Sequence, residues 1–387
     1  MCTGSGSYSQ MPEDNLVKCH DRRTRAWGLC GIIVVLAIAL SQVACGRAII
    51  TDSTDHYGYL SALPHVDVEP YFRSKATEGD VDSPMLWMGN EEEPLVVVTA
   101  KAANDLVFFS AMTGELVQRR GRTGSAMGEL LRPNGIAITD DIAWIVERDN
   151  RRLQLFQLPQ FESLGFFGDD VLIKPYGITV QPQAYSKHSF IAYVTDDYGH
   201  SAVGKNAKGK VKIFDVVIQP DLQARLAGTI AADSADPPLG KVESIMVDPH
   251  HEKLLVADEE AKLVRVYSLD GRYLGVSLGG HVINGDAEGI ALYECSDGSG
   301  YWILTDQGHI RNRFLVHSRS NLSMVGSFSV NHVSNTDGIA VTSNAIGPHG
   351  EGALFVIDDD AGLAAVSWSE IAEKLFLRRC AAPEMPR

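Results

Sequence analysis

The sequence predicts an all-β fold, a six-bladed β-propeller, with an N-terminal membrane-targeting helix in front of it. Three observations support this prediction: one strand-and-turn pattern occurs six times, its copies lie about 50 residues apart, and helical periodicity is almost absent from them. A period of that length, made of short strands and turns, is typical of propellers, in which each repeat forms a four-stranded sheet. With 387 residues, 45% of them apolar, the chain can also bury a sizeable core.

Each repeat begins with a short alternating strand that follows a polar turn. These strands are Pro84–Met88, Asn134–Ile138, Tyr176–Val180, Glu243–Val247, Glu288–Leu292 and Asp337–Val341. A strongly apolar strand follows in every repeat, at Leu95–Val98, Ile142–Ile145, Phe190–Val194, Leu254–Val256, Tyr301–Leu304 and Leu354–Val356. The starts of the apolar strands are 47, 48, 64, 47 and 53 residues apart, so the third interval contains an insertion.

We place this insertion around 205–212. Its four lysines fit a solvated, mobile hairpin better than a binding loop, because that is the usual behaviour of a charge run. They are Lys205, Lys208, Lys210 and Lys212. A propeller must also close its ring, and Val66–Arg73, in front of the first repeat, can add a strand to the last blade. One clear helical stretch, Ser369–Leu377, follows the blades.

The N-terminal region has the pattern of a membrane-targeting segment. Ala26–Gly46 is uncharged and mostly apolar, and it follows a basic cluster of Arg22, Arg23 and Arg25. It is long enough to span a bilayer as an anchor, while its small-residue end is typical of a cleaved signal peptide, so both interpretations stay open. The preceding basic residues predict that the bulk of the chain is exported, to the cell envelope (membrane-anchored or periplasmic) or to the extracellular space.

These patterns divide the chain into four parts. Residues 1–46 are the signal peptide or membrane anchor, 47–65 a tether, 66–368 the propeller, and 369–387 a C-terminal helix and tail. We expect a monomer that contacts the membrane through its N-terminal segment. Of the six cysteines, only Cys295 and Cys380 lie beyond residue 45, and they can pair if the domain is exported, which the sequence does not decide.

Charge and motifs exclude several classes of function. The chain has 34 Lys and Arg against 49 Asp and Glu, a net charge of −15, which argues against a nucleic-acid partner. The sequence contains no His-x-x-Glu-His motif, so a zinc site of that type has no support. An acidic protein of this kind needs bound cations if its substrate is an anion.

Acidic residues are common in the turns before the first strand or after the second strand of repeats one, four, five and six. Such turns converge at the channel mouth of a propeller, where ligands bind. Carboxylates gathered there repel one another unless cations neutralise them, and hard oxygen ligands select Ca²⁺ or Mg²⁺. The alternative is that they are ordinary solvated turn residues, and spacing alone leaves both open. The residues are Asp80, Asp82, Glu243, Asp258, Glu259, Glu260, Asp286, Glu288, Asp337, Asp358, Asp359 and Asp360.

Two turn motifs in the second half of the chain are specific when they occur together. They are Asp-Ala-Glu-Gly-Ile at 286–290 and Thr-Asp-Gly-Ile at 336–339, and 242–260 and 354–359 add two similar stretches. In this combination the chain resembles the β-propeller phytases, six-bladed calcium-dependent phosphatases that hydrolyse phytate. The resemblance runs from about Gly79 to Gly362 and is stronger in the second half.

The resemblance implies a cofactor, a reaction and a set of site residues. The cofactor is Ca²⁺, with the ligands Asp82, Glu243, Glu259, Asp286, Glu288 and Asp337. Phytate or a related small phosphate monoester is then attacked by a water whose pKa the metal lowers, without a covalent intermediate. Glu259, Glu288 and Arg148 are the expected catalytic residues, and Arg148 also grips a substrate phosphate. Tyr176, Gln307 and Lys101 line the substrate site.

Several positions depart from the family pattern. Ser83 stands where the family has a second Asp, and Asn331 aligns with another ligand Asp. Paired lysines of the family fall on Ala102 and Ala103, with Lys101 beside them, and a later lysine position falls near 196–197.

These departures keep a second function open. Repeat two, Arg132–Phe156, looks like an NHL repeat, and such propellers mostly bind partners. The alternative is therefore a non-catalytic, NHL-like propeller that binds a protein or a glycan. For Arg148, Arg151 and Arg152 the sequence leaves open both a solvated face and a phosphate grip.

Overall fold

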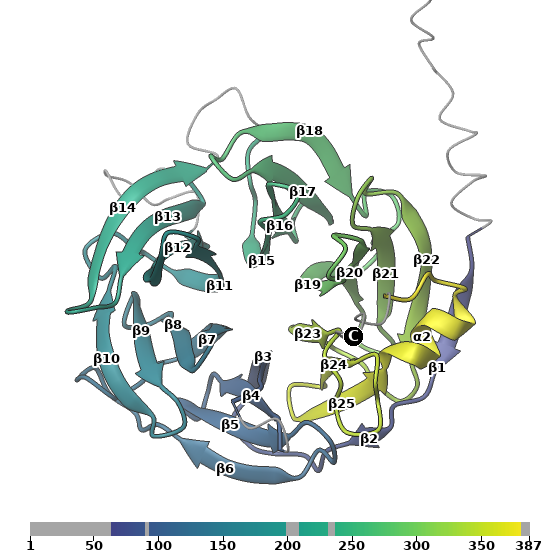
Figure 1. Cartoon of the computed structure of the whole chain (residues 1–387), viewed down its shortest axis with the longest axis horizontal. Helices are drawn as coiled ribbons and strands as arrows, with labels where there is room; N and C mark the ends of the chain where they lie inside the picture. The colour runs from purple at the N-terminus through teal and green to yellow at the C-terminus, as the bar shows by residue number, and fades with distance from the viewer. Residues whose placement is uncertain (1–62, 90–92, 199–208, 231–236, 381–387) are drawn as a thin grey trace, which may run out of the picture. The chain divides into compact units, whose positions relative to one another are not determined.

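The computed structural model describes residues 63–89, 93–198, 209–230 and 237–380. These residues form six sheets, antiparallel except for one added edge strand, arranged as blades around a central channel (Figure 1). The six-bladed propeller predicted from the repeats is therefore confirmed. The predicted membrane-targeting helix and most of the tether lie outside the described residues. Among the residues that are described, no helix has both the length and the apolar character needed to span a membrane.

Each blade runs from an inner strand at the channel to an outer strand at the rim (Figure 1). Blades one to three contain β3 Val81–Trp87, β4 Leu95–Ala100, β5 Asp105–Ser110 and β6 Leu116–Arg120; β7 Pro133–Thr139, β8 Ile142–Glu147, β9 Arg152–Gln157 and β10 Glu162–Phe167; and β11 Pro175–Gln183, β12 Ser186–Asp196, β13 Val211–Val217 and β14 Gln223–Ile230.

Blades four to six repeat this plan. They contain β15 Val242–Asp248, β16 Lys253–Asp258, β17 Leu263–Ser268 and β18 Tyr273–Leu278; β19 Asp286–Glu294, β20 Gly300–Gln307, β21 Arg313–Ser318 and β22 Met324–Val330; and β23 Ile339–Thr342, β24 Ala353–Asp358 and β25 Gly362–Ser367. The predicted C-terminal helix is α2, Trp368–Lys374.

The segment in front of the first repeat closes the ring. β2, Phe72–Arg73, pairs antiparallel with β25 and becomes the fourth strand of the last blade, as predicted. β1, His65–Val68, adds a parallel fifth strand to blade five by pairing with β22. A disulfide joins Cys295 to Cys380, so the pairing that the sequence left open is present and ties the C-terminal tail to blade five.

The hydrophobic core lies between the blades. Each of the six clusters of buried apolar side chains found in the described part of the chain draws on two neighbouring blades. For example, Trp144 of blade two packs edge-to-face on Phe190 of blade three, with ring centroids 5.2 Å apart. Because every blade buries both faces against neighbours, ring closure completes the core.

The insertion in the third repeat differs from the prediction. Lys210 and Lys212 were expected on a mobile hairpin, but they are 9% and 1% exposed. Lys212 lies on β13, and the Lys210 ammonium donates to the carbonyl oxygen of Tyr198. The hairpin interpretation is therefore wrong for these two lysines, whose charges have partners inside the blade. Lys205 and Lys208 lie outside the described residues.

Glycines allow neighbouring inner strands to approach closely around the channel. A Cβ at Gly177 would lie 2.1 Å from the carbonyl oxygen of Glu243 in the next blade. A Cβ at Gly338 would lie 2.5 Å from the carbonyl oxygen of Asp82, which closes the ring between blades six and one. Thr195 strengthens the contact between blades three and four, since its hydroxyl accepts from the Gly177 N–H and donates to the Glu243 carbonyl.

We expect Gly177→Ala to lower the free energy of unfolding by about 2–3 kcal/mol, because the added methyl group meets rigid backbone of the next blade. Gly280→Ala is the matched control, since a Cβ there has no heavy atom within 4 Å, and its effect should stay within about 0.5 kcal/mol. Chemical denaturation of both variants measures the difference. Equal stability of the two would show that the inner strands are not packed this closely.

Candidate active site

A β-bulge in the inner strand turns one side chain per blade toward the channel. In five inner strands the register with the second strand shifts at the same point, between Val81 and Pro84 in blade one and at the equivalent residues of blades two to five. Bulges redirect side chains at the rims of barrels and near active sites. The bulge positions, named here with the corresponding Asp337 of blade six, are Asp82, Asn134, Tyr176, Glu243, Glu288 and Asp337.

Five of the bulge positions line one cavity in the channel. The cavity has a volume of about 60 Å³, and all six inner strands contribute to its wall. In blade two Gly135 reaches the wall, whereas Asn134 is fully buried and both polar atoms of its side chain lack a hydrogen-bond partner. A space of this size holds ions and a few waters, so an organic phosphate has to bind at the mouth.

A second set of side chains comes from the ends of the second strands, where polar residues occur in pairs. The first residue of each pair is structural in five blades. In blade five, for example, Asp306 accepts from the N–H groups of Asn284 and Gly285 and forms an ion pair with Arg313 at 2.8 Å. The corresponding acids are Glu147, Asp196, Asp258 and Asp358. These acids, of which all but the half-buried Asp358 are buried, bind the entry turn of their blade to a basic side chain of the same blade.

The second residue of each pair follows the structural acid in five blades and follows Ala100 in blade one. These residues are Lys101, Arg148, Asp197, Glu259, Gln307 and Asp359. Of them, Lys101, Glu259 and Gln307 contact the carboxylates of the bulge positions. The pairing thus separates adjacent acids by role: Asp258 stabilises its blade, whereas Glu259 joins the site.

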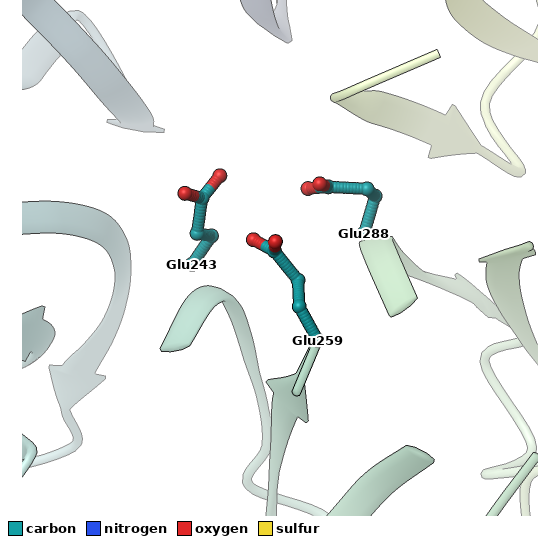
Figure 2. A group of neighbouring side chains, drawn as sticks. All are labelled: Glu243, Glu259 and Glu288. Atoms are coloured by element: carbon teal, nitrogen blue, oxygen red, sulfur yellow. The ribbon is translucent and has the colours of Figure 1, made fainter. Parts of the chain in front are cut away.

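Three glutamates form the most compact group of acids, named here the glutamate cluster: Glu243, Glu259 and Glu288. One carboxylate oxygen from each lies within 4.8 Å of the others, and all three side chains are buried. Figure 2 shows the carboxylates pointing into a shared space. Glu259 Oε1 is buried without a hydrogen-bond partner, so the group has acceptor capacity that the protein itself does not use.

The other side of the mouth already has a cation. Lys101 Nζ lies 2.7 Å from Asp82, 2.9 Å from Asp337 and 3.4 Å from Asp80. We name Asp80, Asp82 and Asp337 the aspartate cluster. The Tyr176 hydroxyl donates to Asp82 at 3.1 Å. Lys101 is only 8% exposed, so the structure places this predicted substrate residue among carboxylates, as their counter-ion.

Gln307 donates to Asp337 at 2.6 Å, which adds a second partner to that carboxylate. Ser83, at one of the departures noted in the sequence, donates to its neighbour Asp82 at 2.6 Å. Asn331, at the other, donates to Glu69. Both side chains that differ from the family pattern therefore form hydrogen bonds within the protein.

The remaining predicted residues lie further out. Asp286 is exposed, and its negative charge helps to raise the pKa of Glu259, so it lies near the glutamate cluster without being buried in it. Arg148 is half-buried and forms an ion pair with Asp149 at 2.9 Å. Arg152 was considered for a solvated face or a phosphate grip, and both interpretations are wrong: it is 3% exposed and paired with Glu147 at 2.6 Å.

Burial and mutual repulsion make these carboxyl groups weak acids. Burial, with Glu259 nearby, raises the pKa of Glu243 to about 7. Burial, with Asp82 nearby, raises the pKa of Asp337 to about 7. Burial and the neighbouring acids raise the pKa of Glu288 well above its ordinary value. A cation brought among these groups favours their ionised forms, and carboxylate oxygens suit a hard divalent ion, so the residues present fit a metal such as Ca²⁺.

Two residues of the site were missed from the sequence. Lys241 Nζ lies 3.0 Å from Glu243 and 2.5 Å from Glu259. Its position two residues before Glu243 was the available signal, because alternate residues of an extended segment share a face. Asn134 has the same place in repeat two as Asp82 and Glu243 have in theirs, so aligning the repeats would have found it.

Comparison with known proteins agrees with this geometry. Residues 239–375 match the phytase family model, which confirms the resemblance inferred from the sequence over that part of the chain and supports a phosphatase-type hydrolase. The match includes the glutamate cluster and Asp337. The chain is also 26% identical over 157 residues to a 3-phytase of Bacillus subtilis (strain 168). That alignment covers 35% of this chain and 40% of the relative's length.

In the absence of metal, we expect stability to fall as the pH rises from about 5 to 7.5. Glu243 and Asp337 ordinarily have pKa values of 4.5 and 3.8, and both are raised to about 7 in the folded protein. Within this window the folded protein therefore holds protons that the unfolded chain has lost, so deprotonation favours unfolding. Melting temperatures in chelator at the two pH values test this.

Glu243→Gln should weaken the dependence of the metal-free melting temperature on pH, since the amide cannot ionise. Adding Ca²⁺ at pH 7.5 should raise the melting temperature of the wild type, because the metal binds the folded state. A metal-free melting temperature that is higher at pH 7.5 than at pH 5 would contradict the arrangement of buried acids described above.

Proposed function

We propose that this chain is a calcium-dependent phosphomonoesterase of the phytase type, which hydrolyses phytate or a related phosphate monoester at the channel mouth. The observation that supports it best is the glutamate cluster, because this buried oxygen-rich group lies within the segment that matches the phytase family. The chain spans less than half the length of the curated 3-phytase to which it is similar, so the activity is a proposal for this protein.

Glu243, Glu259 and Glu288 would hold the metal, with Asp286 at its exposed side. Bound there, Ca²⁺ would neutralise substrate phosphate and lower the pKa of a water that attacks phosphorus in line. Tyr176 and Gln307 hold Asp82 and Asp337 in place through their hydrogen bonds. Lys101 offsets part of the negative charge of the aspartate cluster through its ion pairs with Asp80, Asp82 and Asp337.

The substrate would lie outside the 60 Å³ cavity, with one phosphate at its opening. Arg148 occupies in blade two the position that Glu259 occupies in blade four, so it belongs to the same rim. Its guanidinium would exchange Asp149 for a phosphate oxygen, since both are anions and Arg binds phosphate through two parallel hydrogen bonds.

The decisive variant is Glu288→Gln, which keeps the shape of the side chain and removes one ligand charge. Phosphate release from phytate in the presence of calcium should fall by orders of magnitude, because metal activation supplies several kcal/mol of the barrier lowering. In chelator the same variant should melt at a temperature at or above that of the wild type, because a buried acid among like charges has been removed.

Glu373→Gln is the matched control, since Glu373 is exposed on α2, and its turnover should equal that of the wild type. If the wild type releases no phosphate from phytate or simpler monoesters with calcium present, the enzymatic proposal fails. The alternative, a propeller that binds a protein or a glycan, then becomes the better description. If Glu288→Gln hydrolyses phytate as fast as the wild type, the activity stands but the active site lies elsewhere in the protein.

We also propose that the propeller is exported, on the basis of the apolar segment at 26–46 and the arginines before it. Protease added to spheroplasts should then digest an anchored propeller without lysis, and a cleaved form should appear in the periplasm or the medium. Full protection until the cells are lysed would place the domain in the cytoplasm and overturn the proposal.

A further inference from the structure

Lys241 enters the glutamate cluster from its solvent side. Its ammonium forms ion pairs with Glu243 and Glu259, whose carboxylates are 7% and 6% exposed, while its own side chain is 47% exposed. The ammonium can therefore leave the carboxylates by rotation of an alkyl chain that is already half in water. No part of the core has to open for this movement.

One ammonium does not satisfy the glutamate cluster. Glu243, Glu259 and Glu288 offer oxygens within 4.8 Å of one another, yet Glu259 Oε1 remains buried without a partner. Within the described residues, Lys241 forms ion pairs with Glu243 and Glu259 but not with the buried Glu288. A divalent cation would bring more charge into the same space and accept ligands from all three carboxylates.

Lys241 and a metal ion cannot share this space, because they would use the same oxygens and repel each other at short range. We propose that Lys241 is a displaceable counter-ion of the glutamate cluster, which competes with the metal and so sets the metal affinity of the site. This inference rests on the metal-binding part of the proposed function.

Lys101 shows the contrasting arrangement. It contacts all three members of the aspartate cluster and is only 8% exposed, so its ammonium has no comparable route into solvent. We therefore assign the aspartate cluster a permanent internal cation and the glutamate cluster an exchangeable one. The metal enters on the side where the internal cation can leave.

Two substitutions of Lys241 should change calcium affinity in opposite directions. Lys241→Met keeps the length of the side chain but removes the competing charge, so the full chain should bind Ca²⁺ about tenfold more tightly or better. Lys241→Arg provides a planar guanidinium that bridges two carboxylates more strongly, so calcium should bind several-fold more weakly. Isothermal titration calorimetry with Ca²⁺ alone measures both affinities without any substrate.

Lys374→Met is the matched control, because Lys374 is 41% exposed and pairs with Glu370 at 3.0 Å on α2. Its calcium affinity should equal that of the wild type. If both Lys241 variants bind calcium with wild-type affinity, or if both shift the affinity in the same direction, Lys241 does not compete with the metal. The proposed function is unaffected by either result. Failure of the wild type and of both variants to bind calcium overturns the competition and the proposed metal site together.

Discussion

Repulsion among buried carboxylates at one end of the channel is the constraint on which the rest of the site depends. Asp82, Glu243, Glu259, Glu288 and Asp337 come from four blades and are all buried or nearly so. The raised pKa values of Glu243, Glu288 and Asp337 express the cost of ionising these neighbouring groups together. Two lysines offset part of this cost, one for each cluster, and the geometry leaves the glutamate cluster short of positive charge. A site of this kind binds cations because the fold has already gathered the ligands.

The backbone geometry of the propeller brings these carboxylates together. Each inner strand is pressed against its neighbours, and the same bulge in five of them turns one side chain per blade toward the channel. At the ends of the second strands a structural acid binds the entry turn, and the next residue is left to the site. In blade four, for example, Asp258 stabilises the blade through Arg265, and the adjacent Glu259 joins the glutamate cluster.

The two halves of the chain contribute unequally to the proposed activity. The segment that matches the phytase family contains the glutamate cluster and Asp337, whereas the first half contributes Asp82, Lys101 and Arg148. The positive groups of the first half already have acidic partners in the structure. In the proposed function, binding of substrate and metal at the mouth would require exchange of partners, for Arg148 as for Lys241, so the strength of these internal ion pairs would control how readily phosphate and metal enter.

The repeat period and the alternation of apolar residues determined the number of blades, the inner strands and the closing strand, because these depend on patterns local in the chain. Most bulge positions could be named from the sequence for the same reason. Tertiary structure alone decided that Lys101 and Lys241 neutralise acids, that Lys210 and Lys212 are buried, and that Cys295 pairs with Cys380. Ion pairs and burial depend on distances between blades, and a bulge changes by one residue which side chain faces the channel, so spacing along the chain does not encode them.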